Sequence, residues 1–81
     1  MTTVTFYHSV ICPRCQAAGL FLSRILEDFP EIELEKVEYL ANMGAARKEG
    51  VRSIPTLKSG DSQLSGFLLR PKQMREFLAL L

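Results

Sequence analysis

The spacing of apolar residues changes several times along the chain, and each change predicts a new element. Residues 3–8 alternate between apolar and polar positions and are rich in β-forming side chains, which predicts a strand. From Arg14 to Pro30 the apolar residues instead recur at helical spacing, and Pro13 suits the first helical turn because its missing N–H costs nothing there. The apolar positions of this predicted helix are Ala17, Ala18, Phe21, Leu22, Ile25, Leu26 and Phe29.

The segment after this helix predicts a second strand whose phase changes part-way. Residues 31–35 alternate strictly between acidic and apolar side chains. Near Lys36 the alternation slips, since Val37 and Tyr39 fall on the other parity. Either a β-bulge or a strand buried on both faces accounts for this slip.

The last part of the chain predicts a short helix, a hairpin and a final helix. Residues 42–49 have the pattern of a short helix, and Gly50 is placed as its C-terminal cap. The turn residues at 59–62 predict a β-hairpin formed by residues 56–58 and 63–65. Pro71 begins a last helix with an apolar face of Met74, Phe77, Leu78 and Leu81.

The resulting order is β-α-β-α-β-β-α, which predicts an α/β fold. The first β-α-β unit requires a right-handed crossover, so its two strands lie parallel, whereas the hairpin adds antiparallel neighbours. We therefore expect a mixed four-stranded sheet flanked by helices, in a single domain that covers residues 1–81.

Composition and charge narrow the classes of function. The chain is 47% hydrophobic and 23% charged, as ordinary soluble globular proteins are. Ten Lys and Arg against nine Asp and Glu leave a net charge of +1, which indicates no nucleic-acid partner and no membrane partner. No apolar run approaches the roughly 20 residues that span a bilayer, and the first residues lack the pattern of a signal peptide. We therefore expect a cytoplasmic protein.

The two cysteines stand three positions apart in the segment Cys12-Pro13-Arg14-Cys15. A disulfide that closes so short a loop adds little stability, whereas the spacing suits a bond that opens and closes reversibly. Cys12 lies at the start of the predicted helix, where the helix dipole and the Arg14 cation favour a thiolate. We therefore expect Cys12 to be the exposed nucleophile and Cys15, one turn inside, to resolve the mixed disulfide. Pro13 and Arg14 are expected to tune the redox properties of the pair.

The order of elements resembles the thioredoxin fold in its minimal, glutaredoxin-sized form. The resemblance rests on Cys-Pro-x-Cys at the start of the first helix and on Ser53-Ile54-Pro55-Thr56 before the hairpin, and it covers nearly the whole chain. It implies a dithiol electron carrier that reduces the disulfides of other proteins. It also implies a cis Pro55 beside the cysteines and a bound substrate backbone beside Ile54. The implied substrate-binding surface consists of Val10, Ile11, Pro13, Arg14, Ile54 and Pro55.

Details of the sequence bear on the electron donor. Arg14 stands where glutaredoxins carry tyrosine, and Ser9 where they often carry lysine. Ser65-Gly66-Phe67, followed after Leu68-Leu69 by Arg70-Pro71, resembles the motif of the small glutaredoxin-like redoxins that serve ribonucleotide reductase. Those proteins take electrons from thioredoxin reductase, so the resemblance implies that donor here, with glutathione as the alternative.

A different class of function stays open, namely a redox-sensing or metal- or iron–sulfur-cluster-binding module without general reductase activity. A closed zinc site needs four ligands, and His8 is the only histidine beside the two thiols, so we expect no metal and no cofactor within one chain. A cluster shared across a dimer is the remaining form of this alternative, as in some glutaredoxins. His8 is expected to be a surface residue at the strand end, or else to modulate the thiolate. Phe67 is expected on an exposed partner-binding surface.

Overall fold

The computed structural model describes residues 2–81 and contains the predicted order of strands and helices. Two short 3-10 helices, η1 (Leu26–Asp28) and η2 (Leu40–Asn42), are additional to that order. The strands are β1 (Thr2–His8), β2 (Ile32–Glu38), β3 (Thr56–Ser59) and β4 (Ser62–Ser65). The α-helices are α1 (Pro13–Ile25), α2 (Met43–Lys48) and α3 (Pro71–Ala79).

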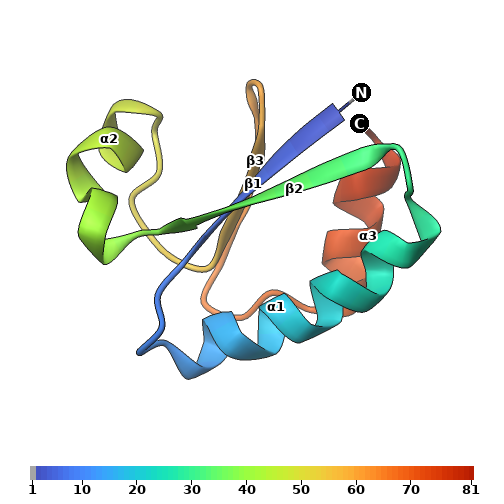
Figure 1. Cartoon of the computed structure of the whole chain (residues 1–81), viewed down its shortest axis with the longest axis horizontal. Helices are drawn as coiled ribbons and strands as arrows, with labels where there is room; N and C mark the ends of the chain where they lie inside the picture. Colours follow the sequence, from blue (N-terminus) through green and yellow to red (C-terminus); the bar gives the residue numbers. More distant parts are fainter. Residues whose placement is uncertain (1) are drawn as a thin grey trace.

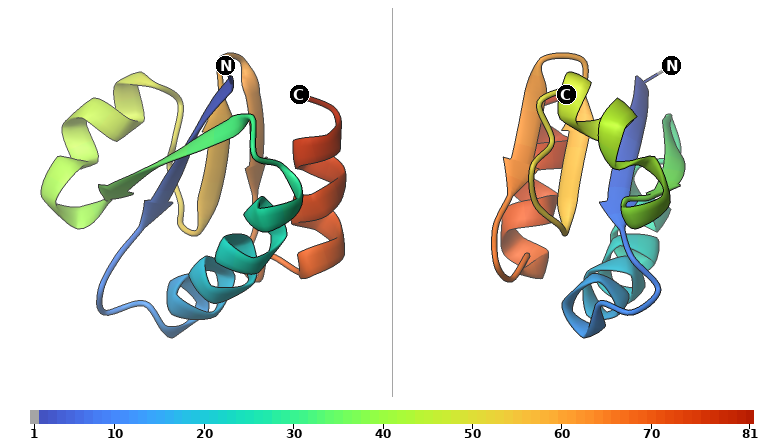
Figure 2. Two further views of the ribbon diagram at one scale, coloured as in Figure 1. Left: turned by 45° about the vertical axis from the view of Figure 1, so that its right-hand side comes forward. Right: turned by 90° about the vertical axis from the view of Figure 1, so that its left-hand side faces the viewer.

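The four strands form one mixed sheet in the order β2-β1-β3-β4. β1 pairs with β2 in parallel and with β3 in antiparallel orientation, and β3 and β4 form the hairpin. Helices α1 and α3 cover one face of the sheet and α2 lies on the other, as Figures 1 and 2 show. The predicted fold, a mixed four-stranded sheet flanked by helices, is therefore confirmed.

Alternating side chains of β1 supply the core on both faces of the sheet. Val4 and Phe6 point toward α1 and α3, whereas Tyr7 points toward α2. The larger cluster of buried residues consists of Val4, Phe6, Ala18, Leu22, Ile25, Leu57, Leu69, Met74 and Leu78. The smaller cluster, on the α2 face, consists of Tyr7, Tyr39, Ala46 and Val51. Since β1 is central and buried on both faces, its end is a rigid base for the loop that follows it.

The slip in the apolar pattern of β2 comes from contacts on both faces of the strand, not from a bulge. The parallel register between β1 and β2 runs without interruption from Thr2 opposite Ile32 to His8 opposite Glu38. Leu34 packs against the larger cluster and Val37 against the smaller one. The first part of β2 is therefore apolar on the face that α1 and α3 cover. The last part is apolar on the face where α2 lies.

The first helix ends earlier than its apolar pattern predicts. α1 stops at Ile25 and continues only as η1, and its buried residues are Cys15, Ala18, Leu22 and Ile25. Phe21 is exposed because it lies at the border of this stripe, next to Leu22. Leu81 is likewise exposed, beyond the end of α3. No helix within residues 2–81 is both long enough and apolar enough to cross a membrane.

Gly50 follows the short helix α2 with a φ of 84°, a conformation in which a Cβ is strained. We expect Gly50→Ala to lower the free energy of unfolding by about 1 kcal/mol, measured by urea denaturation. Gly44→Ala is the matched control, because Gly44 lies within α2 and an added Cβ would meet nothing within 4 Å. The control should be neutral or slightly stabilising. Equal losses in the two variants would contradict this account of the cap.

Candidate functional site

The cysteine pair lies where the central strand turns into the first helix. β1 ends at His8, and a tight turn follows in which the Cys12 N–H donates to the Ser9 carbonyl at 3.1 Å. Cys12 is then the N-cap of α1, with extended backbone angles, and Pro13 is the first helical residue. This is the position expected from the sequence for a proline that lacks an N–H.

The sulfur of Cys12 has the role that a hydroxyl or carboxylate oxygen has at other helix starts. Its Sγ accepts a hydrogen bond from the backbone N–H of Cys15 at 3.2 Å, and both cysteines are free thiols. The sulfur therefore faces the unpaired N–H groups and the positive end of the helix dipole. Anions are commonly bound at such a position in proteins.

Cys12 is less accessible than the sequence analysis predicts. Its exposed fraction is 8%, against 2% for Cys15, so both residues are buried. The expectation of an exposed nucleophile is corrected to a nearly buried one, because the tight turn and the hydrogen bond hold the Cys12 sulfur against the first turn of α1. Cys12 still has the larger exposed fraction of the two cysteines, as the sequence analysis predicts.

The thiol of Cys15 is held in its protonated form by its surroundings. Burial raises the pKa of Cys15 to about 11, and the side chain of Cys12 adds to the rise through a hydrogen bond and its charge. A backbone hydrogen bond from Ser9 and the charge of Arg14 oppose these effects but do not cancel them. At neutral pH Cys15 must therefore lose a proton before it can attack a disulfide.

Arg14 is held in place by an aromatic ring from a distant loop. Its Cζ lies 4.0 Å from the centroid of the Phe67 ring, a cation–π contact. Its Nε is buried and has no hydrogen-bond partner within residues 2–81. Phe67 is 77% exposed, which confirms its expected place on the surface. The contact was missed by sequence reasoning, which considered each residue separately, because no local pattern indicates the pairing.

The residues proposed for substrate contact differ in exposure. Val10 and Ile11 are 69% and 76% exposed, as expected for a docking surface, and Ile54 is partly buried. Pro55 is fully buried, so its expected place on the open surface is wrong. The Ile54–Pro55 peptide is cis, as the resemblance implied. Pro55 precedes Thr56, which pairs with Tyr7, so it lies at the same end of the sheet as the cysteine turn. It packs beneath the surface there because the strand that it precedes, β3, lies inside the sheet between β1 and β4.

Glu38 is a further residue of the site, and the sequence analysis did not single it out. Its carboxylate oxygens accept hydrogen bonds from the backbone N–H groups of Val10 and Ala41, both at 3.1 Å. These bonds, that from Val10 first, lower the pKa of Glu38, against a smaller effect of desolvation. The end of β2 is thereby joined to the turn that carries the cysteines. An acidic residue at the end of a strand of alternating pattern was the only available signal.

The charge of Glu38 is expected to make stability depend on pH. A depressed carboxyl pKa stabilises the folded state above the ordinary value of 4.5, and this stabilisation is lost as the pH falls through the lower, folded-state pKa. Glu38→Gln should therefore have a lower urea midpoint than the wild type at pH 7, and the gap should close in acid. Glu33→Gln, an exposed carboxylate on the same strand, is the control and should follow the wild type. A gap that stays constant in acid would contradict this role.

His8 is the last residue of β1, and its ring stacks on a neighbouring aromatic side chain. It is partly buried, and its ring stacks on Phe6 with centroids 5.3 Å apart and an interplanar angle of 20°. Both alternatives for His8, a surface role at the strand end and an effect on the thiolate, stay predictions. No cluster of three or more Cys, His, Asp or Glu side chains suited to a metal occurs in the described part of the chain.

Solved structures of thioredoxins share this arrangement of strands, helices and turn. Thioredoxin O2 from Arabidopsis thaliana matches with a TM-score of 0.80 and 18% identity, over 100% of this chain and 75% of its own. Mitochondrial thioredoxin 3 from Saccharomyces cerevisiae matches with a TM-score of 0.80 and 20% identity, over 99% and 78%. Thioredoxin from Trypanosoma brucei brucei matches with a TM-score of 0.81 and 24% identity, over 98% and 73%.

The chain has the thioredoxin fold. No protein-family model and no curated protein matches its sequence. The identities of the three thioredoxins, 18% to 24%, make this a likeness of fold. Within the thioredoxin fold of this chain, the Cys-Pro-Arg-Cys segment begins the first helix, and the cis proline precedes the hairpin strand beside the central one.

Proposed function

We propose that the protein is a thiol–disulfide oxidoreductase that reduces the disulfides of other proteins through Cys12 and Cys15. The observation that carries this proposal is the hydrogen bond from the Cys15 N–H to the Cys12 sulfur at the start of α1. It places one sulfur at the positive end of the helix dipole and the second within the same helical turn. The likeness of fold to thioredoxins supports the same reaction class.

The reaction proceeds in two exchanges. The Cys12 thiolate attacks one sulfur of the substrate disulfide, a bond forms between the two, and the other substrate sulfur leaves with the electron pair. The Cys15 sulfur, once deprotonated, then attacks Cys12, and the second substrate sulfur leaves as a thiolate. The substrate gains two electrons, and the pair Cys12 and Cys15 is oxidised to a disulfide. A donor must return two electrons to complete the cycle.

The surface around the cysteines supports a protein substrate. Val10, Ile11 and Phe67 are exposed apolar side chains beside the motif, a combination typical of docking surfaces. We further propose that the protein works in the cytoplasm, where a reducing environment keeps such a pair active. Thioredoxin reductase is the proposed donor and glutathione the alternative.

A disulfide reduction assay tests the proposed function. Purified protein with dithiothreitol should accelerate the precipitation of insulin well above the rate with dithiothreitol alone. The donor is tested by following NADPH consumption with thioredoxin reductase, and separately with glutathione and its reductase. Turnover with glutathione alone would overturn the proposed donor. Absence of catalysis together with co-purified iron or zinc would favour the cluster-binding alternative.

A further inference from the structure

Arg14 is a cation that pairs with no anion of its own chain within residues 2–81. The only ion pair in this part of the chain joins Arg75 to Asp28. Glu38, the carboxylate at the cysteine turn, instead accepts two backbone hydrogen bonds. The Arg14 Nε is buried and has no hydrogen-bond partner within the same residues. Buried donors are nearly always paired in folded proteins, so this one indicates an acceptor that another molecule supplies.

Phe67 limits the directions in which the Arg14 guanidinium can bind. The Arg14 Cζ lies 4.0 Å from the centroid of the Phe67 ring, so one side of the guanidinium rests on the ring. The N–H groups of a guanidinium lie in its plane, where a carboxylate can accept two parallel hydrogen bonds. A side chain that is already held loses little rotamer freedom on binding. The contact with Phe67 therefore prepares Arg14 to bind a carboxylate.

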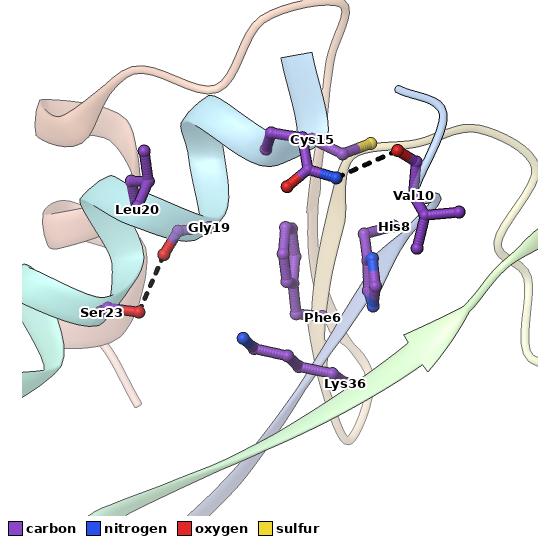
Figure 3. Close-up of a pocket in the computed structure, with 9 residues that line it drawn as sticks. Phe6, His8, Val10, Cys15, Gly19, Leu20, Ser23 and Lys36 are labelled. Atoms are coloured by element: carbon purple, nitrogen blue, oxygen red, sulfur yellow. Dashed lines mark hydrogen bonds between the residues drawn. The ribbon is translucent and has the colours of Figure 1, made fainter. Parts of the chain in front are cut away.

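The turn before α1 adds apolar side chains that are also held in place. Val10 and Ile11, which directly precede Cys12, are 69% and 76% exposed. The Gln16 side-chain amide donates a hydrogen bond to the Val10 carbonyl at 3.2 Å. Figure 3 shows this bond at Val10, beside a cavity of about 240 Å³ that also reaches Cys15. A substrate that covers these apolar side chains excludes water from the site, which strengthens an ion pair formed there.

We propose that Arg14 makes the protein prefer disulfides that have an acidic side chain beside one of their cysteines. This preference rests on the proposed function and leaves its two exchanges unchanged. The substrate carboxylate accepts hydrogen bonds from the Arg14 guanidinium while Cys12 attacks the neighbouring sulfur. Because Arg14 lies only two positions after Cys12, and residues of an extended chain are about 3.3–3.4 Å apart, the acidic residue must lie within one or two positions of the substrate cysteine. Charge complementarity of this kind selects among partners.

Two peptide disulfides with blocked ends test this preference, one with glutamate beside the cysteine and one with glutamine there. Blocked ends remove the terminal charges, so the peptides differ by a single carboxylate. The second-order rate constant of the pre-reduced protein is measured for each peptide by acid quench and mass spectrometry. Each value is divided by the rate constant with dithiothreitol, which removes the intrinsic reactivity of the peptide. The wild type should prefer the glutamate peptide by about tenfold, and the preference should shrink as salt is added.

The ratio of the two rate constants separates recognition from effects on the cysteines. The charge of Arg14 lowers the pKa of Cys15, but a change in that pKa affects both peptides alike. In Arg14→Gln the ratio should fall to about one, and Arg14→Glu should prefer a peptide with lysine at the same position. Phe67→Leu, which removes the ring, should lower the ratio. Arg47→Gln removes an exposed cation on α2 and is the control, so its ratio should equal that of the wild type.

Three results would contradict parts of this account. Equal normalised rate constants of the wild type with both peptides would overturn the preference and leave the proposed function standing. A ratio that Arg14→Gln retains would overturn the role of Arg14. A wild-type protein that reduces neither peptide would overturn the proposed function, and the preference with it.

Discussion

Replacement of Cys12 by serine should reduce the insulin-reduction rate to that of dithiothreitol alone. The hydroxyl that remains is a far weaker nucleophile than a thiolate, and Cys15 is too buried and too firmly protonated to replace it. Mixed with a disulfide substrate in the absence of dithiothreitol, Cys15→Ser should instead complete the first exchange and stop, because no second thiol lies in the same helical turn. Turnover and intact mass after mixing with a disulfide substrate measure both effects.

The two cysteine variants should therefore differ in mass, not only in rate. Cys15→Ser is expected to accumulate a covalent adduct with the substrate, whereas Cys12→Ser should form none. Ser62→Ala, an exposed serine on β4, controls for handling and should turn over as the wild type does. An adduct on Cys12→Ser with none on Cys15→Ser would show that the two sulfurs have the opposite roles.

Leu22→Ala should lower the free energy of unfolding by about 2–5 kcal/mol, a large part of the roughly 5–15 kcal/mol that holds a domain together. Leu22 is 0% exposed and lies in the larger cluster, where the lost methyl groups leave a cavity. The measurement is the urea midpoint at constant slope.

Leu20→Ala is the matched control, since Leu20 belongs to the same helix and is 68% exposed. It should change the free energy of unfolding by about 0.5 kcal/mol or less. Similar losses in the two variants would mean that the assigned buried face of α1 is wrong.

The spacing of apolar residues predicts the helices and strands because apolar residues recur with a different period in each. Residues 3–8 were expected as a strand and β1 is Thr2–His8, and the hairpin strands also differ only at their ends. The limit of this reasoning appears on α1. Ala17 and Ala18, or Phe21 and Leu22, are adjacent apolar residues, and the pattern does not say which member of each pair is buried. That choice depends on where the helix axis lies over the sheet, which local spacing does not encode.

The motif that carries the proposed chemistry was visible in the sequence, but its environment was not. Cys12 and Cys15 could be identified from their spacing, and the cis peptide before Pro55 from the resemblance. The near burial of Cys12, the carboxylate of Glu38 at the turn and the cavity beside Cys15 all depend on contacts between segments far apart in the chain. Such contacts follow from the register of β1 and β2 and from the position of α1, and only the folded structure defines them.

The position of the Arg14 charge depends on Phe67, a residue that lies outside the cysteine motif. The guanidinium is held on a ring that belongs to the connection between β4 and α3, so its distance from the two sulfurs depends on that connection. A change at Phe67 alone would free the cation and expose it to solvent without altering any residue of the motif. The charge that lowers the pKa of Cys15 is thus held by a residue of the connection after β4, far from the motif in the chain.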